Sequence, residues 1–110
     1  MSTANLNGWL PNDKANGLAD IATDLIAEPG RVRTAIILFD TTRITTKVDT
    51  RTRTATARIR HFEPILESED EIAADQLLRA ALRRRTGSDE LPEGLGLDQP
   101  VLPFDDTDEE

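Results

Sequence analysis

A long stretch in the middle of the chain, residues 31–65, is dominated by Val, Ile and Thr and alternates apolar with polar positions over most of its length. This composition, with a period of two, is typical of β-strands. The pattern is interrupted by a polar segment at Asp49–Thr52, so the sequence predicts two long strands joined by a tight turn. The register that follows pairs Val48 with Arg53 and places His61 opposite Asp40.

The two faces of this predicted hairpin differ in chemistry. One face, with Ile44, Val48 and Ile59 among its members, is mostly apolar, whereas the other is basic. Towards the base, Ala35–Phe39 is apolar without alternation, which indicates burial on both faces. The basic side chains of the hairpin and its tip are Arg43, Lys47, Arg51, Arg53, Arg58 and Arg60.

Helical spacing of apolar residues precedes the hairpin. Leu18, Ile21 and Leu25 belong to a stripe that predicts an amphipathic helix over Asp13–Glu28, ended by Pro29-Gly30. Residues 1–12 are polar and contain Gly8 and Pro11, so they are expected to form a flexible arm.

A second helix follows the hairpin. Ser68 as N-cap and Glu71 three residues later predict a capping box, and Gly87 is placed to end the helix. The run Arg83–Arg85 suits the negative end of the helix dipole. The order helix–strand–strand–helix therefore predicts an α+β fold, in which a long antiparallel hairpin packs on two helices.

The element pattern also sets the expected domain organisation. Residues 13–87 form the α+β domain, and residues 88–110, rich in Pro, Gly and acids, form a disordered tail. Two strands and two helices make a thin core, so a symmetric homodimer with Phe39 and Phe62 near its interface is expected, unless the helix over 13–28 covers these two residues. The alternative is that residues 89–104 fold back and cover the core.

The net charge of −8 is unevenly distributed along the chain. Residues 31–61 carry eight bases and two acids, whereas residues 86–110 carry nine acids and no base. A basic hairpin and an acidic tail thus share one chain, and each is able to bind a partner of opposite charge or to neutralise the other.

The composition also narrows the chemistry that is expected. Cysteine is absent, which excludes disulfides and thiolate sites. Neither a signal peptide nor a membrane span is recognisable, so a cytoplasmic location without membrane contact is expected. The single histidine, His61, has no nucleophile placed beside it, so we expect a binding protein rather than an enzyme, with no cofactor and no metal.

The tail contains one apolar cluster, Gln99-Pro100-Val101-Leu102-Pro103-Phe104. This hexapeptide resembles the motif by which bacterial replication and repair proteins bind the DNA sliding clamp, although Pro100 stands where a leucine is common. The resemblance implies that Gln99 makes polar contacts at the rim of the clamp's pocket, that Leu102 and Phe104 fill the pocket, and that Pro103 holds the turn. The partner-binding residues expected from it are Gln99, Val101, Leu102, Pro103 and Phe104.

The chain as a whole, with its RVRTAIILFD and ARIRHFE strands and its LPFDD tail, is similar to small acidic proteins of actinobacterial phages. The resemblance implies a phage-infected bacterial host as the setting. The leading hypothesis is an accessory protein that binds replication machinery, the sliding clamp, through the tail. One alternative is a nucleic-acid-binding β-ribbon that is regulated by the acidic tail, because a two-stranded ribbon fits the DNA major groove. The other alternative is an inhibitor of a host defence or regulatory protein.

Overall fold

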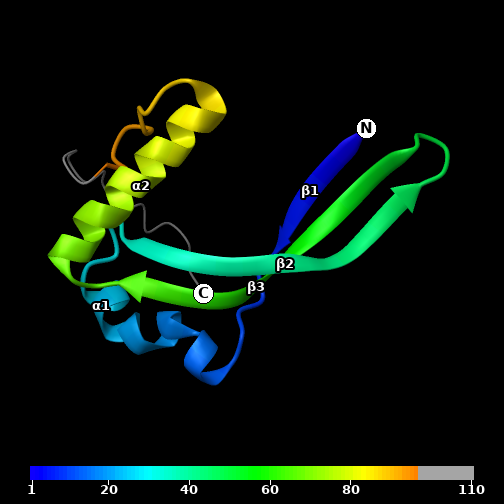
Figure 1. Cartoon of the computed structure of the whole chain (residues 1–110). Coiled ribbons are helices and arrows are strands. Elements are labelled where there is room, and N and C mark those ends of the chain that lie inside the picture. The colour runs from blue at the N-terminus through cyan, green and yellow to red at the C-terminus, as the bar shows by residue number, and fades with distance from the viewer. Residues whose placement is uncertain (97–110) are drawn as a thin grey trace. The chain divides into compact units, whose positions relative to one another are not determined.

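The computed structural model describes residues 1–96, which form a three-stranded sheet and helices (Figure 1). The chain divides into two compact units. One contains Met1–Ile21 and Ala35–Pro64, and the other contains Ala22–Thr34 and the chain from Ile65 onward. The predicted α+β class is confirmed, with three strands in place of two.

The first unit is built on the predicted hairpin. Strands β2 (Thr34–Lys47) and β3 (Thr52–Ile65) each have 14 residues, as the long β-branched stretch predicts. The turn occupies residues 48–51 and therefore begins one residue earlier than the sequence pattern suggests. Its last residue, Arg51, has a φ of 56°, in the left-handed region that few side chains favour.

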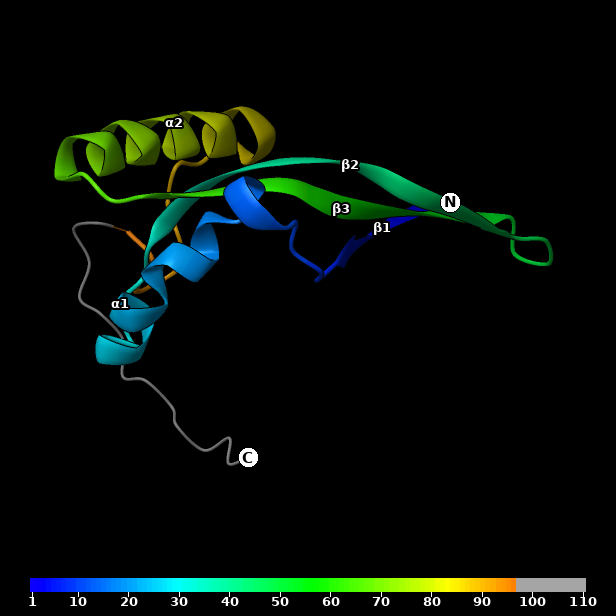
Figure 2. The same cartoon turned by 90° about the horizontal axis from the view of Figure 1, so that it is seen from below.

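The N-terminus differs from the expected flexible arm. Ser2–Asn7 forms a strand, β1, that pairs in parallel with β3, from Ser2 opposite Arg53 to Asn7 opposite Arg58. The sheet order is β1-β3-β2, and Figure 2 shows β1 beside the distal half of β3. The polar sequence of β1 gave no strong strand signal, but the edge of β3 offers backbone donors and acceptors that β1 satisfies.

The predicted continuous helix over Asp13–Glu28 is wrong. The segment instead contains two 3₁₀ helices, η1 (Asp13–Ala15) and η2 (Gly17–Ile21), and the short helix α1 (Ala22–Ala27). The break lies where Asn16 forms an isolated bridge with Phe62 of β3, and its side-chain Oδ1 accepts a hydrogen bond from the Leu18 N–H at 3.2 Å. Tertiary pairing thus outweighs helical spacing here.

In the second unit, the long helix α2 (Ser68–Thr86) is confirmed, but its predicted capping box is wrong. Glu67 is the N-cap and makes no side-chain capping bond, while the Glu71 N–H donates to the Glu67 carbonyl at 2.9 Å. At the other end Gly87 adopts a φ of 87° and closes the helix by donating to the Arg83 carbonyl, as predicted.

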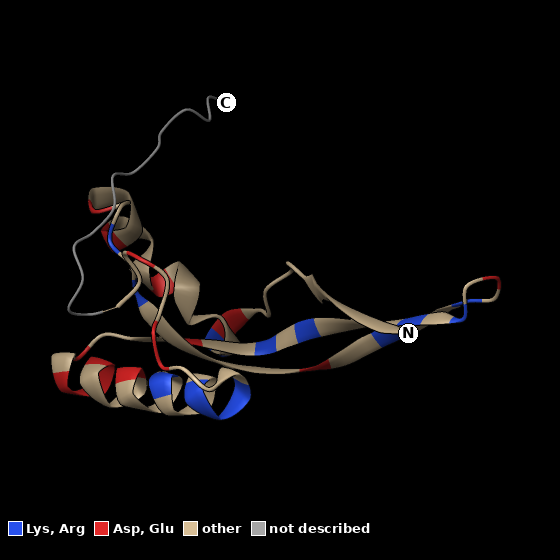
Figure 3. Cartoon of the chain, turned by 90° about the horizontal axis from the view of Figure 1, so that it is seen from above, with Lys and Arg blue, Asp and Glu red and all other residues tan. Residues whose placement is uncertain are grey.

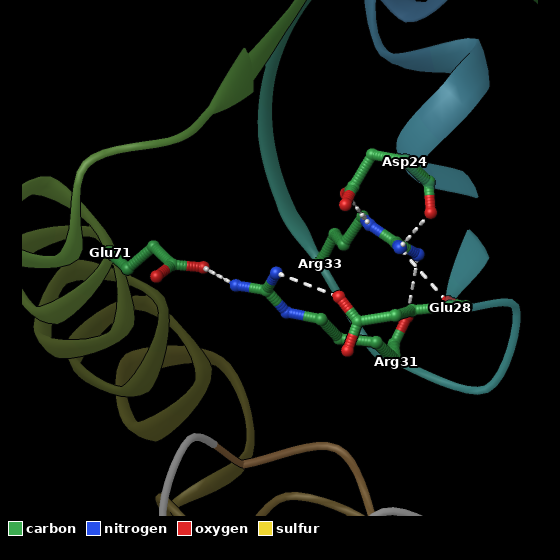
Figure 4. A network of polar contacts seen from close by, with 5 residues as sticks. All are labelled: Asp24, Glu28, Arg31, Arg33 and Glu71. Carbon is green, nitrogen blue, oxygen red and sulfur yellow. Dashed lines mark hydrogen bonds and ion pairs between the residues drawn. The ribbon is translucent and has the colours of Figure 1, made fainter. Parts of the chain in front are cut away.

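Two arginines organise the segment that follows α1 (Figure 4). The Arg33 guanidinium donates to the Asp24 carboxylate and to the carbonyls of Asp24 and Glu28, each at 2.9 Å, and to the Arg31 carbonyl at 3.0 Å. Its side chain is only 15% exposed. Arg31 forms a longer ion pair of 3.7 Å with Glu71 of α2. Arg33 thereby adds side-chain hydrogen bonds to two carbonyls at the end of α1 that also accept from backbone, the Asp24 carbonyl from the Glu28 N–H and the Glu28 carbonyl from the Arg31 N–H.

Burial of apolar side chains is very limited in this chain. Within residues 1–96 only Ile21 among the hydrophobic residues is buried. The expected burial of Ala35–Phe39 on both faces is wrong for the single chain, since Leu38 and Phe39 are 62% and 68% exposed. The physical reason is that β2 is an edge strand, which has a neighbouring strand on one side only.

Candidate nucleic-acid interface

The predicted basic side chains all lie on the hairpin of the first unit. Figure 3 shows lysines and arginines spaced along β2 and β3 and at the turn that joins them. The structure separates them into two groups, which differ in whether an acid neutralises them.

The inner group is centred on Asp40. Its carboxylate accepts hydrogen bonds from Arg58 Nε at 2.9 Å and from Arg60 Nη1 at 3.0 Å. The hydrogen bond from Arg58 is the main reason that the pKa of Asp40 is lowered from its usual value of 3.8, and the same bond raises the pKa of Arg58. One acid therefore offsets much of the charge of two predicted contact residues.

The predicted pairing of Asp40 with His61 is wrong. His61 Nε2 lies 2.8 Å from Glu63 Oε1, two residues along the same strand. Because side chains two apart on a strand share a face, this pair needs no partner from β2. The sequence signal for the Asp40 cluster is a single acid within a basic strand, since the other acid of residues 31–61, Asp49, lies in the turn.

The outer group lies in the distal half of the hairpin. All four members are exposed, and no ion pair joins any of them to an acid within the described part of the chain. Their charges are therefore directed to solvent without local compensation. The group, named here the distal basic group, consists of Arg43, Lys47, Arg51 and Arg53.

The distal basic group is not confined to one face. A shallow hollow of about 210 Å³ is lined by Ser2, Thr3, Ile44, Arg53 and Ala55. Arg53 therefore shares a face with the apolar Ile44 and with β1, on the side of the hairpin where the predicted register places it opposite Val48. Nearby, the hydroxyls of Thr3 and Thr54 lie 2.6 Å apart. Positive charge and hydroxyl groups thus flank the distal ribbon, and both are groups that bind phosphate.

One of the basic residues at the end of α2, Arg83, makes contacts at the end of the helix. Arg83 forms an ion pair of 3.7 Å with Asp89, and the Arg83 carbonyl accepts the closing bond from Gly87. This agrees with the expectation that arginines at the end of a helix serve its terminus.

The predicted peptide Gln99–Phe104, with its contact residues Gln99, Val101, Leu102, Pro103 and Phe104, lies outside the described residues. Within residues 1–96 there is no group of three or more His, Asp or Glu side chains arranged to hold a metal. None of the helices in that range combines the length and the apolar character that a membrane crossing requires.

Comparisons of the chain with protein-family models, with curated proteins and with solved structures gave no match.

Proposed function

We propose that the protein is a non-enzymatic binding protein that contacts nucleic acid through the distal half of its β-hairpin. The observation that carries the proposal is the distal basic group, four exposed cations with no ion pair to any acid among residues 1–96. A two-stranded ribbon fits the major groove of B-DNA, and uncompensated cations release counterions when they meet phosphates.

The affinity for nucleic acid is expected to depend on salt concentration. If all four members of the group contact phosphates, the logarithm of the binding constant falls with the logarithm of salt concentration with a slope of about −3.6. Binding is measured by fluorescence anisotropy of a labelled duplex of mixed sequence, with the full chain, between 25 and 200 mM salt (roughly the range over which the effect is large). Absence of binding at the lowest salt contradicts the proposal.

Asp40 provides a specific variant for this test. Asp40→Asn frees Arg58 and Arg60 from the carboxylate that now holds them, so it is expected to tighten binding and to steepen the salt slope. Asp20→Asn makes the same change in net charge on η2, which contacts the base of β3 at Phe62 and Pro64 and not its distal half, and is the matched control. Equal effects of the two variants would show that only net charge matters and that the hairpin is not the contact surface.

A second proposed function is favoured by the sequence of the tail. The hexapeptide Gln99–Phe104 resembles the sliding-clamp-binding motif, and an acidic, Pro-containing segment is suited to extending into a groove. In this proposal the hairpin and the tail bind different partners, so both functions are compatible in one molecule.

The clamp is tested separately from DNA. Purified bacterial sliding clamp is titrated with the full chain, and the double variant Leu102→Ala with Phe104→Ala is expected to abolish binding. The control is Leu95→Ala with Leu97→Ala, which also truncates two large apolar side chains, just outside the hexapeptide. Unchanged affinity of the first variant, or no binding by the unaltered protein, contradicts this proposal.

A further inference from the structure

The outer edge of β2 is the largest unpaired feature of the sheet. Because the sheet order is β1-β3-β2, one side of this 14-residue strand has no strand beside it among residues 1–96 (Figure 1). An edge of this kind presents backbone N–H and C=O groups as a template for another strand. Natural proteins usually protect such edges with charge, proline or a covering segment.

The first part of this edge carries none of those protections. Thr34–Phe39 contains no charged residue and no proline. Its side chains are also exposed to water in the single chain: Ile36 by 52%, Ile37 by 39%, Leu38 by 62% and Phe39 by 68%. Since successive residues of a strand point to opposite faces, apolar surface is exposed on both faces of the sheet at once. A covering layer on one face would leave the other exposed, whereas an added strand supplies side chains to both.

We propose that the occupant of this edge is a second copy of the chain, whose β2 pairs antiparallel with the first β2 about a two-fold axis at Leu38. A two-fold axis perpendicular to the sheet leaves each residue on the same face in both copies. Two residues can therefore lie opposite each other across the two β2 strands only if their residue numbers differ by an even number. With the axis at Leu38, each copy's Leu38 meets the other, and Ile37 meets Phe39 of the second copy. The apolar pairs at the centre are thus Leu38 with Leu38 and Ile37 with Phe39, and Ile36 lies opposite Asp40 further out.

Neighbouring registers are less favourable. An axis at Phe39 would leave Phe39 with Phe39 as the one apolar pair, because Leu38 then lies opposite Asp40 and Ile37 opposite Thr41. An axis at Asp40 would bring two carboxylates together, which destabilises a strand pair. An axis at Ile37 also pairs apolar residues, but it overlaps only residues 34–40, whereas the axis at Leu38 overlaps residues 34–42. The longer ladder pairs more of the backbone N–H and C=O groups along the edge of β2.

Charge does not oppose the dimer in this register. The only charged side chain in the overlap is Asp40, and it keeps Arg58 and Arg60 as its partners on β3, away from the new edge. The two Asp40 residues are four positions apart in the ladder, about 14 Å, which exceeds the screening length at physiological salt. The dimer would extend the sheet to the order β1-β3-β2-β2-β3-β1 and would display two distal basic groups.

The absence of native cysteine makes a cross-linking test direct, because an introduced thiol is unique in each chain. In the full chain, Leu38→Cys places two thiols directly opposite, with Cβ atoms about 4.5–5.5 Å apart, within reach of a disulfide after slight adjustment. Thr42→Cys lies on the same face of the same strand, but its two copies are about 27 Å apart in this register. Mild oxidation is expected to link Leu38→Cys almost completely and to leave Thr42→Cys unlinked.

Sedimentation provides the independent measurement. The unaltered protein is expected to sediment as a dimer at micromolar concentration, Leu38→Lys as a monomer, and Thr46→Lys, which adds the same charge outside the overlap, as a dimer. A monomeric unaltered protein, or equal linking of the two cysteine variants, overturns the proposal and indicates that a strand of another protein or another segment of this chain occupies the edge.

Discussion

At the scale of single residues, Gly17 is a position that has no room for a side chain. It is buried, and a Cβ at this position would lie 2.5 Å from Pro64 Cδ and 2.9 Å from the Phe62 carbonyl oxygen. The carbonyl belongs to backbone and the proline ring is rigid, so neither atom is able to move away cheaply. Glycine here is what allows the segment after Asn16 to lie against β3.

Gly17→Ala is therefore expected to lower the free energy of unfolding by about 1–3 kcal/mol, the usual cost of forcing extra volume into a packed site. Gly8→Ala is the control, because no atom lies within 4 Å of a Cβ at that position. Urea denaturation of both variants measures the difference. An unaltered midpoint for Gly17→Ala would show that β3 and this segment are not held together in solution.

Arg51 has a backbone conformation that is unfavourable for a residue with a side chain. Its φ of 56° costs an L residue about 1–2 kcal/mol, whereas glycine adopts the conformation freely but loses more entropy on folding. Arg51→Gly is expected to stabilise the protein by about 0.5–1 kcal/mol. The matched control is Arg53→Gly, which removes the same charge from a position within β3 and is expected to destabilise by about 0.5–1 kcal/mol. Thermal unfolding distinguishes the two, and a loss of stability in both variants would contradict the role of the turn.

At the scale of secondary-structure elements, the hairpin should respond to acid through Asp40. Its folded-state pKa is lowered below 3.8, so its contribution to stability is present above that pH and is lost as pH falls through the lowered value. Asp40→Asn lacks this contribution at every pH. The difference in urea midpoint between the unaltered protein and the variant is thus expected to be present at pH 6 and to shrink at low pH. High salt should also reduce this difference in urea midpoint, because the side chains of Asp40, Arg58 and Arg60 are exposed. A difference that is constant with pH would contradict the ion-pair explanation.

The short helix α1 depends on a side chain outside it. Its six residues are too few to be stable alone, and Arg33 supplies hydrogen bonds to carbonyls at its end. Arg33→Lys keeps the charge but loses the planar fork that reaches several acceptors, and it is expected to cost about 2 kcal/mol. Arg31→Lys is the control, since its ion pairs are 3.7 and 4.0 Å long and its side chain is 45% exposed, so an effect within about 0.5 kcal/mol is expected. Amide hydrogen exchange in Ala22–Ala27 reports the loss, and equal protection in both variants would contradict it.

At the scale of the whole molecule, the opposite charges of the hairpin and the tail predict competition. The tail's last residues include Asp105, Asp106, Asp108, Glu109 and Glu110. Replacing these five by their amides in the full chain is expected to strengthen binding to a DNA duplex at low salt, because fewer carboxylates then compete with phosphates for the distal basic group. The gain should fade as salt rises. Unchanged affinity at low salt would show that the tail does not act on the hairpin.

The limited core is also a whole-molecule property. A chain of 110 residues in which Ile21 is the only buried hydrophobic residue of the described range has little apolar burial with which to offset the entropy of folding. Association at the β2 edge would supply part of this burial. The protein's stability is accordingly expected to rise with its concentration, as it does for proteins whose folding and assembly are linked.

The sequence alone determined the elements whose signals are local. The β-branched run of residues 31–65 is sufficient to predict β2 and β3 as a hairpin, and Gly87 after a basic turn is sufficient to predict where α2 ends. These predictions succeed because steric preference and backbone capping act within a few residues. The basic character of the hairpin was equally evident, since charge is a property of composition.

Only the tertiary structure decided the features that depend on contacts between distant residues. The polar segment Ser2–Asn7 became β1 because β3 offered it an edge, and the predicted helix from Asp13 was interrupted because Asn16 and Gly17 meet Phe62 and Pro64. The choice of Arg58 and Arg60 as partners of Asp40, in place of His61, was likewise set by which side chains share a face of the folded ribbon. In each case the free energy of a long-range contact exceeded a local preference of about 1 kcal/mol or less per residue, which is too weak to fix the conformation by itself.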